Sequence, residues 1–173
     1  MVVVLFASQS KAGANAAEWS RRFERYAKTS GRPLRILSVN ASGDDWAAAL
    51  PLSDEPAILW DASGKMPPKE IEAFLADPPA GAWRFAVRYA GTSPARGVDS
   101  GRWTLGKIRG ALRRLFGRIS DCRPPAASLP SSDLKRLAPV LASLRAERWT
   151  SALSDQARRE GRRTIETPVM WAL

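Results

Sequence analysis

The chain has 173 residues and a mass of 18.9 kDa, with 45% apolar and 25% charged residues, which predicts one globular domain or one domain with a tail. It has no histidine and one cysteine, which excludes Ser-His-Asp triads, Cys-His dyads, His-ligated zinc and an intramolecular disulfide. The formal net charge is +10, and the whole excess lies after residue 80, where 18 basic residues accompany 7 acidic ones. This charge indicates a polyanionic partner such as a nucleic acid, a nucleotide or an acidic protein surface; the alternative is a solvated arginine-rich surface.

Strands and helices alternate in the first half of the chain. The spacing of apolar residues predicts a strand at 2–7, a helix at 16–28, a strand at 34–39, a short helix at 44–50 and a strand at 57–60. The first helix places Trp19, Phe23 and Tyr26 on one face and ends at Gly31. The opening apolar run is too short for a signal sequence or a membrane span, so we expect a cytoplasmic protein without a transmembrane segment.

The segment after residue 66 continues this alternation. We expect a helix opened by Pro67-Pro68, a strand at 83–90, a loop at 91–101, a strand at 102–105 and a strongly basic amphipathic helix from residue 107. In the strand at 83–90, Trp83 and Phe85 belong to a buried face, whereas Arg84 and Arg88 belong to a face exposed to solvent. The fold class predicted by these elements is α/β (or α+β) with a mixed sheet.

The last third of the chain is predicted to be helical. Residues 121–132 are rich in proline and serine and are typical of a linker. Asp133 is a suitable N-cap for a helix whose inward residues are Leu134, Leu137, Leu141 and Leu144, and a polar helix follows at 145–163. We therefore expect a core at 1–120, a linker at 121–132 and a basic helical extension at 133–173 packed on the core.

The segment 102–115, RWTLGKIRGALRRL, carries the strongest candidate for a binding site. A strand running into Gly106 would place Arg109 in the first turn of a helix, where free N–H groups and the helix dipole favour phosphate. Arg113 lies four residues further on, on the same face, and both guanidinium groups are suited to phosphate oxygens. A solvated basic helix is the alternative interpretation of the same pattern.

The order of elements around this segment resembles the ParB/sulfiredoxin superfamily, and among its members the plasmid fertility inhibition factors of the Osa type. The resemblance covers residues 57–116 at most and rests on PPKEIEAFLAD, WRFAVRYA and RWTLGKIRGALRRL, in which Gly106 and Arg109 match the G-x-x-R motif. It implies a nucleotide site at Gly106 and Arg109, to which the helical spacing adds Arg113. It also implies ATP or another nucleoside triphosphate with Mg²⁺, ATP hydrolysis, DNA degradation, and blockade of conjugative transfer at a type IV secretion coupling protein.

Lys107 departs from the pattern of this superfamily. Sulfiredoxins have a nucleophilic cysteine after the motif glycine, so reduction of sulfinic acids is excluded here, and ParB proteins have a glutamate that is associated with metal and triphosphate. Lys107 is instead expected to pair with phosphate. With Lys107 and Arg109, the candidate catalytic residues are Asp61, which is also the best-placed metal ligand at the end of a strand, and Glu24. Glu70 and Glu72 are further acidic candidates, and a surface carboxylate is the alternative interpretation for each.

Three functions are compatible with the sequence. The first is a nucleotide hydrolase and nuclease that uses Arg109 to stabilise developing phosphoryl charge. The second is a non-enzymatic nucleic-acid-binding protein, and the third is an inhibitor that docks on a secretion machine and so lies at the inner face of the membrane through a partner. The sequence leaves the oligomeric state open. The residues expected to contact DNA are Arg88, Arg102, Arg113, Arg114 and Arg118.

Overall fold

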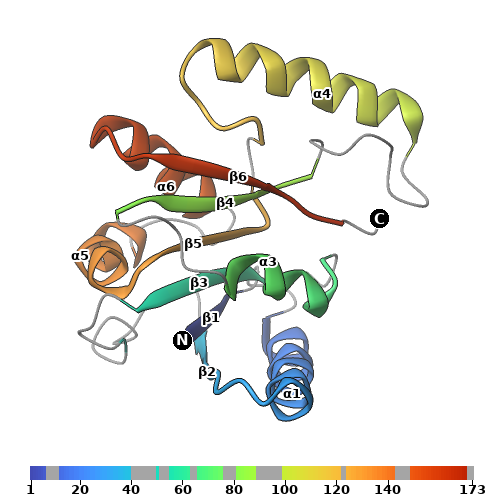
Figure 1. Cartoon of the computed structure of the whole chain (residues 1–173), viewed down its shortest axis with the longest axis vertical. Helices are drawn as coiled ribbons and strands as arrows, with labels where there is room; N and C mark the ends of the chain where they lie inside the picture. Colours follow the sequence, from blue (N-terminus) through green and yellow to red (C-terminus); the bar gives the residue numbers. More distant parts are fainter. Residues whose placement is uncertain are drawn as a thin grey trace.

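A six-stranded mixed sheet runs through the molecule in the order β2-β1-β3-β5-β4-β6 (Figure 1). The structure is a computed structural model that describes residues 1–6, 12–39, 50, 55–62, 66–75, 81–88, 99–121, 124–142 and 149–170. The strands are β1 (Val2–Phe6), β2 (Arg35–Val39), β3 (Pro56–Asp61), β4 (Trp83–Val87), β5 (Ala126–Pro130) and β6 (Thr164–Pro168). The predicted α/β class is confirmed.

The direction of the strands brings the carboxyl ends of β3 and β4 and the amino end of β5 together on one side of the sheet, perpendicular to its outer strands. β1 pairs in parallel with β2 and β3, and β4 pairs in parallel with β6, whereas β5 is antiparallel to both β3 and β4. The carboxyl ends of β3 and β4 therefore lie beside the amino end of β5. We call this side of the sheet the carboxyl edge; in α/β sheets, ligands bind outside the carboxyl ends of the parallel strands.

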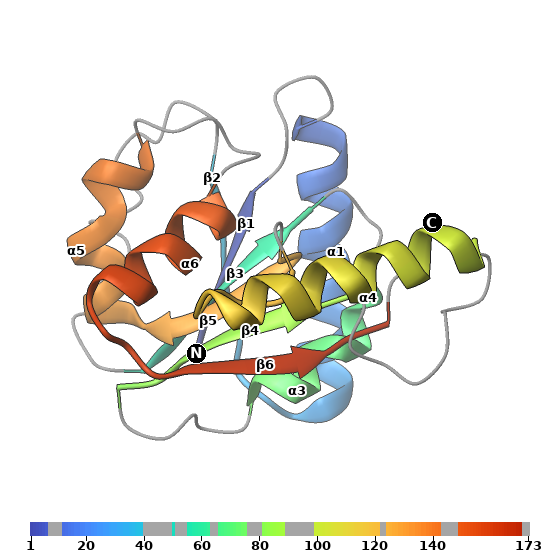
Figure 2. The same ribbon diagram turned by 90° about the horizontal axis from the view of Figure 1, so that it is seen from above.

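Helices cover both faces of the sheet (Figure 2). One face carries α1 (Ala12–Ser30), η1 (Pro68–Ile71) and α3 (Glu72–Leu75), and the other carries α5 (Ser131–Ala142) and α6 (Trp149–Arg159). On the first face Phe23 meets Trp60 edge to face, with ring centroids 5.0 Å apart. On the second face Leu134 and Leu137 of α5 pack with Leu153 of α6, as the predicted apolar spacing required. Among the described helices, none is long and apolar enough to cross a bilayer.

The remaining helix, α4 (Ser100–Leu115), lies beyond the edge strand β6 and outside the two helical layers (Figures 1 and 2). The predicted strand at 102–105 is wrong, since these residues belong to the first turns of α4. The side chain of Asp99 caps the helix by accepting a hydrogen bond from the Gly101 N–H at 3.0 Å. Helix propagation then continues through Gly106, because one interior glycine costs a helix only about 1 kcal/mol.

The predicted linker at 121–132 is also wrong. Residues 126–130 form β5, which lies between β3 and β4, and Ala126, Ala127 and Leu129 are buried. The small side chains of this strand fit between the helices on the two faces of the sheet. The same alanine, serine and proline residues are common in linkers, which is why the sequence pattern predicted a linker here. The part of the chain after residue 130 likewise adds the edge strand β6 to the same sheet, and its helices α5 and α6 pack on one face of that sheet. The predicted division into core, linker and extension therefore does not describe the fold.

The expectation that Arg84 faces solvent is wrong as well. Its side chain is buried against α3 and donates a hydrogen bond to the carbonyl oxygen of Ala73, because both faces of β4 are covered. Three predictions fall wholly or mostly outside the described residues: the short helix at 44–50, the loop at 91–101 and the inward orientation of Leu144.

Candidate functional site: an arginine groove beside α4

A groove of about 920 Å³ separates α4 from the carboxyl edge of the sheet. Leu105, Leu112 and Phe116 form its apolar wall, and Ser120 and Asp121 lie on the opposite side. We name it the arginine groove after its six arginine side chains, which come from the end of β4, from α4, from the segment after α4 and from α6: Arg88, Arg102, Arg109, Arg113, Arg118 and Arg158.

The inner side of α4 is held to the body by the segment that follows it. Gly110 is buried, and a Cβ at this position would lie 3.1 Å from Ser120 Cβ and 3.3 Å from its carbonyl oxygen. Glycine suits this close approach, because a Cβ here would be tighter than ordinary van der Waals contact and Ser120 would have to shift by a few tenths of an ångström. The Nε of Arg113 also donates to the carbonyl oxygen of Ile119 at 2.9 Å. The helix is therefore anchored at its carboxyl half, beside the arginine groove.

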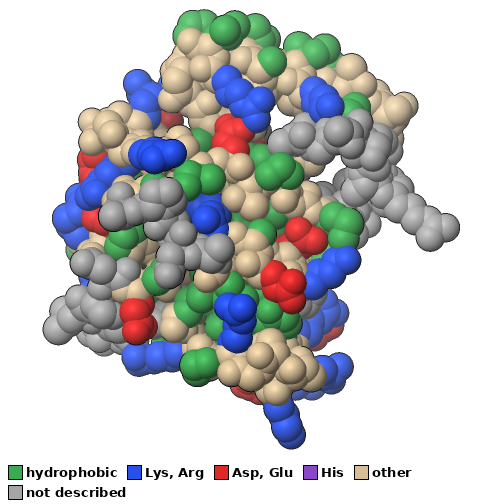
Figure 3. Space-filling model, viewed as in Figure 1, with side chains coloured by type: hydrophobic (Ala, Val, Ile, Leu, Met, Phe, Trp, Pro, Cys, Tyr) green, Lys and Arg blue, Asp and Glu red, His purple; other side chains and the backbone are tan. Residues whose placement is uncertain are grey.

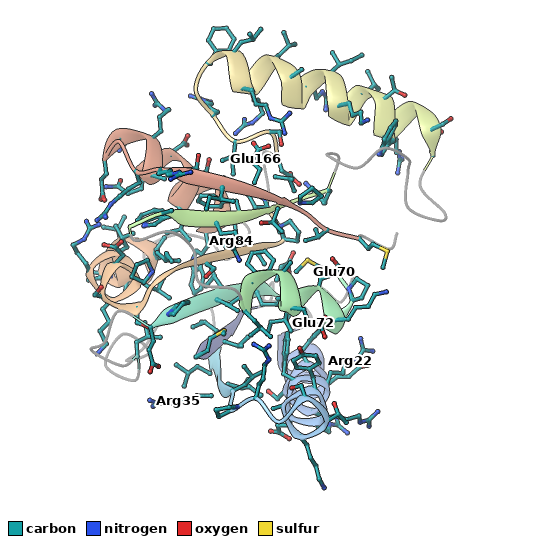
Figure 4. The ribbon with its side chains drawn as sticks, viewed as in Figure 1. Arg22, Arg35, Glu70, Glu72, Arg84 and Glu166 are labelled. Atoms are coloured by element: carbon teal, nitrogen blue, oxygen red, sulfur yellow. The ribbon has the colours of Figure 1, made fainter. Side chains whose placement is uncertain are left out.

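Glu166 of β6 adds an electrostatic anchor on the other flank of α4 (Figure 4). Its carboxylate accepts hydrogen bonds from the Arg114 guanidinium and from the backbone N–H and hydroxyl of Ser120. Burial is the largest single influence on the pKa of Glu166 and acts to raise it, but the bonds from Arg114 and Ser120 together outweigh burial and leave this pKa lowered. The hydrogen bond to Glu166 is in turn the main cause that raises the pKa of Arg114.

The arginine at the end of β4 is fixed by an ion pair with Asp121. Arg88 donates from Nε at 2.8 Å, from Nη2 at 2.7 Å and from its backbone N–H at 3.1 Å. The Asp121 side chain is buried, with 1% of its surface exposed. A bidentate pair of this kind is strong and directional, so it holds the guanidinium at one side of the groove.

The other arginines of the groove are available to a ligand. Within the described part of the chain, the side chains of Arg102, Arg109, Arg118 and Arg158 have no ion pair or hydrogen bond, and all four are exposed. Arg102, Arg109 and Arg113 are seven and four residues apart on α4, so they fall within about 40° of one another around the helix axis. Three guanidinium groups therefore line one flank of α4 along the groove.

The structure brings most of the predicted binding residues together in this groove. It contains all three residues predicted for nucleotide, Gly106, Arg109 and Arg113, and also Arg88, Arg102 and Arg118 from the predicted DNA-binding set. Gly106, however, lies in the middle of α4, where its N–H is part of the helix, so the predicted phosphate cradle at a helix N-terminus is wrong. The arginines meet because they share one helix flank.

The remaining predicted residues lie elsewhere. Lys107 is on the opposite flank of α4, with Nζ 4.0 Å from the Trp103 ring centroid. Arg114, predicted to contact DNA, is on the same flank and pairs with Glu166. Glu24 is exposed on α1, at the other end of the sheet from α4 (Figure 1).

The Mg²⁺ implied by the resemblance does not fit the described residues. Asp61 ends β3 at the carboxyl edge, and its backbone N–H donates to the Pro125 carbonyl oxygen at 2.9 Å. No group of three acidic or cysteine side chains suited to a metal ion occurs within the described ranges. The one described carboxylate of the groove, Asp121, is committed to Arg88. Glu70 belongs to η1 and Glu72 to α3 (Figure 4), and Glu72 accepts a hydrogen bond from the Tyr26 hydroxyl at 3.2 Å.

Sequence reasoning missed the apolar wall of the groove, its neighbour Ser120, and two charged residues, Asp121 and Arg158. Asp121 lies in the predicted linker, and no local pattern indicates its ion pair with Arg88, 33 residues away. Phe116 follows the apolar period of α4, but that period does not show which way the helix faces. Arg158 reaches the groove from α6, a contact that only the tertiary structure brings about.

No family model and no curated protein matches the chain. Among solved structures, the chain is similar to the crystal structure of a glycosyltransferase involved in the glycosylation of the major capsid of PBCV-1. The two share 15% sequence identity with a TM-score of 0.45, and the match covers 96% of this chain and 81% of that one. A likeness this distant carries no argument about function, so the proposals below rest on the described residues.

Proposed function

We propose that the protein binds a nucleotide in the arginine groove, with the phosphates against the guanidinium groups and the base against the apolar wall. The observation that carries this proposal is the convergence of six arginines on a groove in which Asp121 is the one described carboxylate. Since Asp121 neutralises Arg88, the surplus positive charge belongs to the α4 arginines and to Arg118 and Arg158. Charge-assisted bonds from guanidinium to phosphate oxygens are the interaction to which such a surplus is suited.

The shape of the groove favours a small ligand over a purely solvated basic surface. Its volume of about 920 Å³ lies within the range of about 300–1,000 Å³ typical of small-molecule sites. Leu112 and Phe116 give it an apolar wall beside the cations, and Phe116 is 76% exposed. An exposed aromatic ring next to arginines offers a stacking surface for a base. A nucleotide combines the two chemistries that the groove presents.

A single-stranded nucleic acid is the second candidate ligand, and one observation favours it. Arg102 and Arg113 are eleven residues apart, which places their backbones about 16 Å apart along the helix. This span exceeds that of one triphosphate and suits successive phosphates of a strand. Competition between ATP and a short single-stranded oligonucleotide would show whether both use the same groove.

Hydrolysis is not part of this proposal. ATP hydrolysis, DNA degradation and blockade of conjugative transfer stay predictions of the resemblance to the ParB/sulfiredoxin superfamily. That resemblance relied on a strand ending at Gly106, and the residues concerned are helical. The described residues also bring no carboxylate cluster to the groove. We therefore propose binding as the property that the arginine groove confers.

The proposal is tested by removing two cations from the groove and two from elsewhere. The double variant Arg102→Ala/Arg109→Ala should weaken ATP binding roughly 100-fold in isothermal titration calorimetry, at about 1.4 kcal/mol for each charge-assisted contact. Arg21→Ala/Arg25→Ala is the matched control, because it removes the same charge from the exposed face of α1. Equal losses in both variants would show that only net charge matters and would overturn the proposal.

A further inference from the structure

The outer face of α4 is apolar and exposed, which is the reverse of the usual orientation of an amphipathic helix. Figure 3 shows hydrophobic side chains gathered along the side of α4 that points away from the body. Gly110, on the opposite side, is the residue that packs against Ser120. The exposed fractions are 55% for Leu105, 53% for Ile108, 53% for Leu112, 79% for Leu115 and 76% for Phe116. Leu105, Leu112 and Phe116 lie on the side of this face that borders the arginine groove, whereas Ile108 and Leu115 do not line the groove.

Basic side chains border this apolar face on both flanks. Arg102, Arg109 and Arg113 lie on the flank beside the arginine groove, and Lys107 and Arg114 lie on the other flank. Residues 100–115 contain no aspartate or glutamate, so the helix carries a charge of +5, of which one unit, on Arg114, is paired with Glu166 of β6. An apolar stripe between two rows of cations is the pattern of a helix that lies in the plane of a membrane surface.

We propose that α4 docks on the surface of an anionic phospholipid bilayer, with its apolar face inserted between the headgroups and its lysine and arginine side chains at the phosphate level. Charge complementarity selects this occupant: a nucleic acid would leave Ile108 and Leu115 exposed, and a second copy of the helix would oppose +5 with +5. Anionic headgroups attract juxtaposed cations by about 1 kcal/mol for each lysine or arginine near the surface.

This inference goes beyond nucleotide binding and does not depend on it. Ile108 and Leu115 belong to the apolar face but do not line the arginine groove. Docking through this face would leave the inner flank of α4 facing the sheet and would place the arginine groove next to the bilayer surface. The two proposals are therefore separable by substitutions at different residues of one helix.

The test is flotation of the full-length protein with vesicles of phosphatidylcholine alone or of phosphatidylcholine and phosphatidylglycerol at 3:1. We expect binding to the anionic vesicles that weakens with salt, and a loss of at least about 10-fold in Ile108→Asn/Leu115→Asn. The matched control is Val140→Asn, which replaces an apolar residue of α5 that is 61% exposed, and it should bind as the wild type does. ATP affinity should be unchanged in all of them.

A charge variant keeps the test decisive if the double variant does not fold. Lys107→Glu should reduce binding to anionic vesicles several-fold, whereas Lys69→Glu on η1 should not. Three outcomes would overturn the proposal: no binding of the wild type to anionic vesicles, equal binding by wild type and both α4 variants, or sedimentation of the lipid-free wild type as an oligomer that Ile108→Asn/Leu115→Asn dissociates.

Discussion

Asp121 organises the arginine groove at the scale of single residues. It is buried, it takes three hydrogen bonds from Arg88, and it directly follows Ser120, which contacts Gly110 and Glu166. The ion pair therefore links the end of β4 to the segment that holds α4. Removing one partner of a buried pair leaves the other charge without compensation, which costs more than the pair contributes.

Asp121→Asn should accordingly lower the free energy of unfolding by about 3 kcal/mol, the low end for breaking a buried pair. Urea denaturation measures this change. Glu18→Gln is the control, because Glu18 pairs with Arg22 at the exposed surface of α1 and should contribute less than about 1 kcal/mol. An Asp121→Asn protein as stable as the control variant would show that the pair does not hold the carboxyl edge together.

The sequence revealed the cations of the site but not their partners. Arginines four residues apart fall on one helix face, so Arg109 and Arg113 could be grouped in advance, whereas Arg102 was expected in a strand and was predicted only as a DNA contact. The partner of Arg88 is 33 residues away, and the partner of Arg114 is 52 residues away. No local pattern encodes such pairs, because the strand order of the sheet determines them.

At the scale of elements, Glu160 joins α5, α6 and the segment leading to β6. Its carboxylate accepts hydrogen bonds from Arg136 of α5 at 2.8 and 2.9 Å, from Gln156 of α6 at 2.7 Å and from Arg162 at 3.2 Å. The bond from Arg136 is the main cause that lowers the pKa of Glu160 to about 2, followed by the bond from Gln156. The network therefore favours the ionised carboxylate in the folded protein.

This lowered pKa predicts a loss of stability in acid. Because the folded-state pKa lies below the usual value of 4.5, the contribution of Glu160 is complete above about pH 4.5 and is lost as the pH falls toward 2. The free energy of unfolding falls between pH 7 and pH 3 in both proteins. We expect this fall to be about 1 kcal/mol smaller in Glu160→Gln than in the wild type, after allowance for solvent screening. Urea midpoints at the two pH values measure this. Parallel losses in both proteins would contradict the assignment.

Elements with a strong apolar period were predictable, and those defined by their neighbours were not. The spacing of Trp19 and Phe23 predicted α1, and an apolar run predicted β1, because each pattern is complete within its own segment. β5 has small residues with little apolar pattern, and it forms a strand because it pairs with β3 on one side and with β4 on the other. α4 was divided at Gly106, since a glycine after two alternating residues resembles a turn as much as it resembles a helix.

At the scale of the whole molecule, the sheet and α4 together place two surfaces side by side. The carboxyl edge contributes Arg88 and Asp121 to the arginine groove, and α4 closes the groove with one flank while it exposes its apolar face outward. One helix thus takes part in both proposed interactions. Of the 18 basic residues after residue 80, eight belong to α4 or line the arginine groove.

Recognition of nucleotide phosphates by the arginine groove can be measured with a series of adenosine, AMP, ADP and ATP. We predict that affinity rises with each phosphate, by about 10-fold for each added charge-assisted contact, and that ATP binding weakens between 50 and 250 mM salt while adenosine stays weak. Calorimetric titration of the wild-type protein with the four ligands gives the answer. An affinity that does not change along the series, or no measurable binding of ATP, would contradict the account.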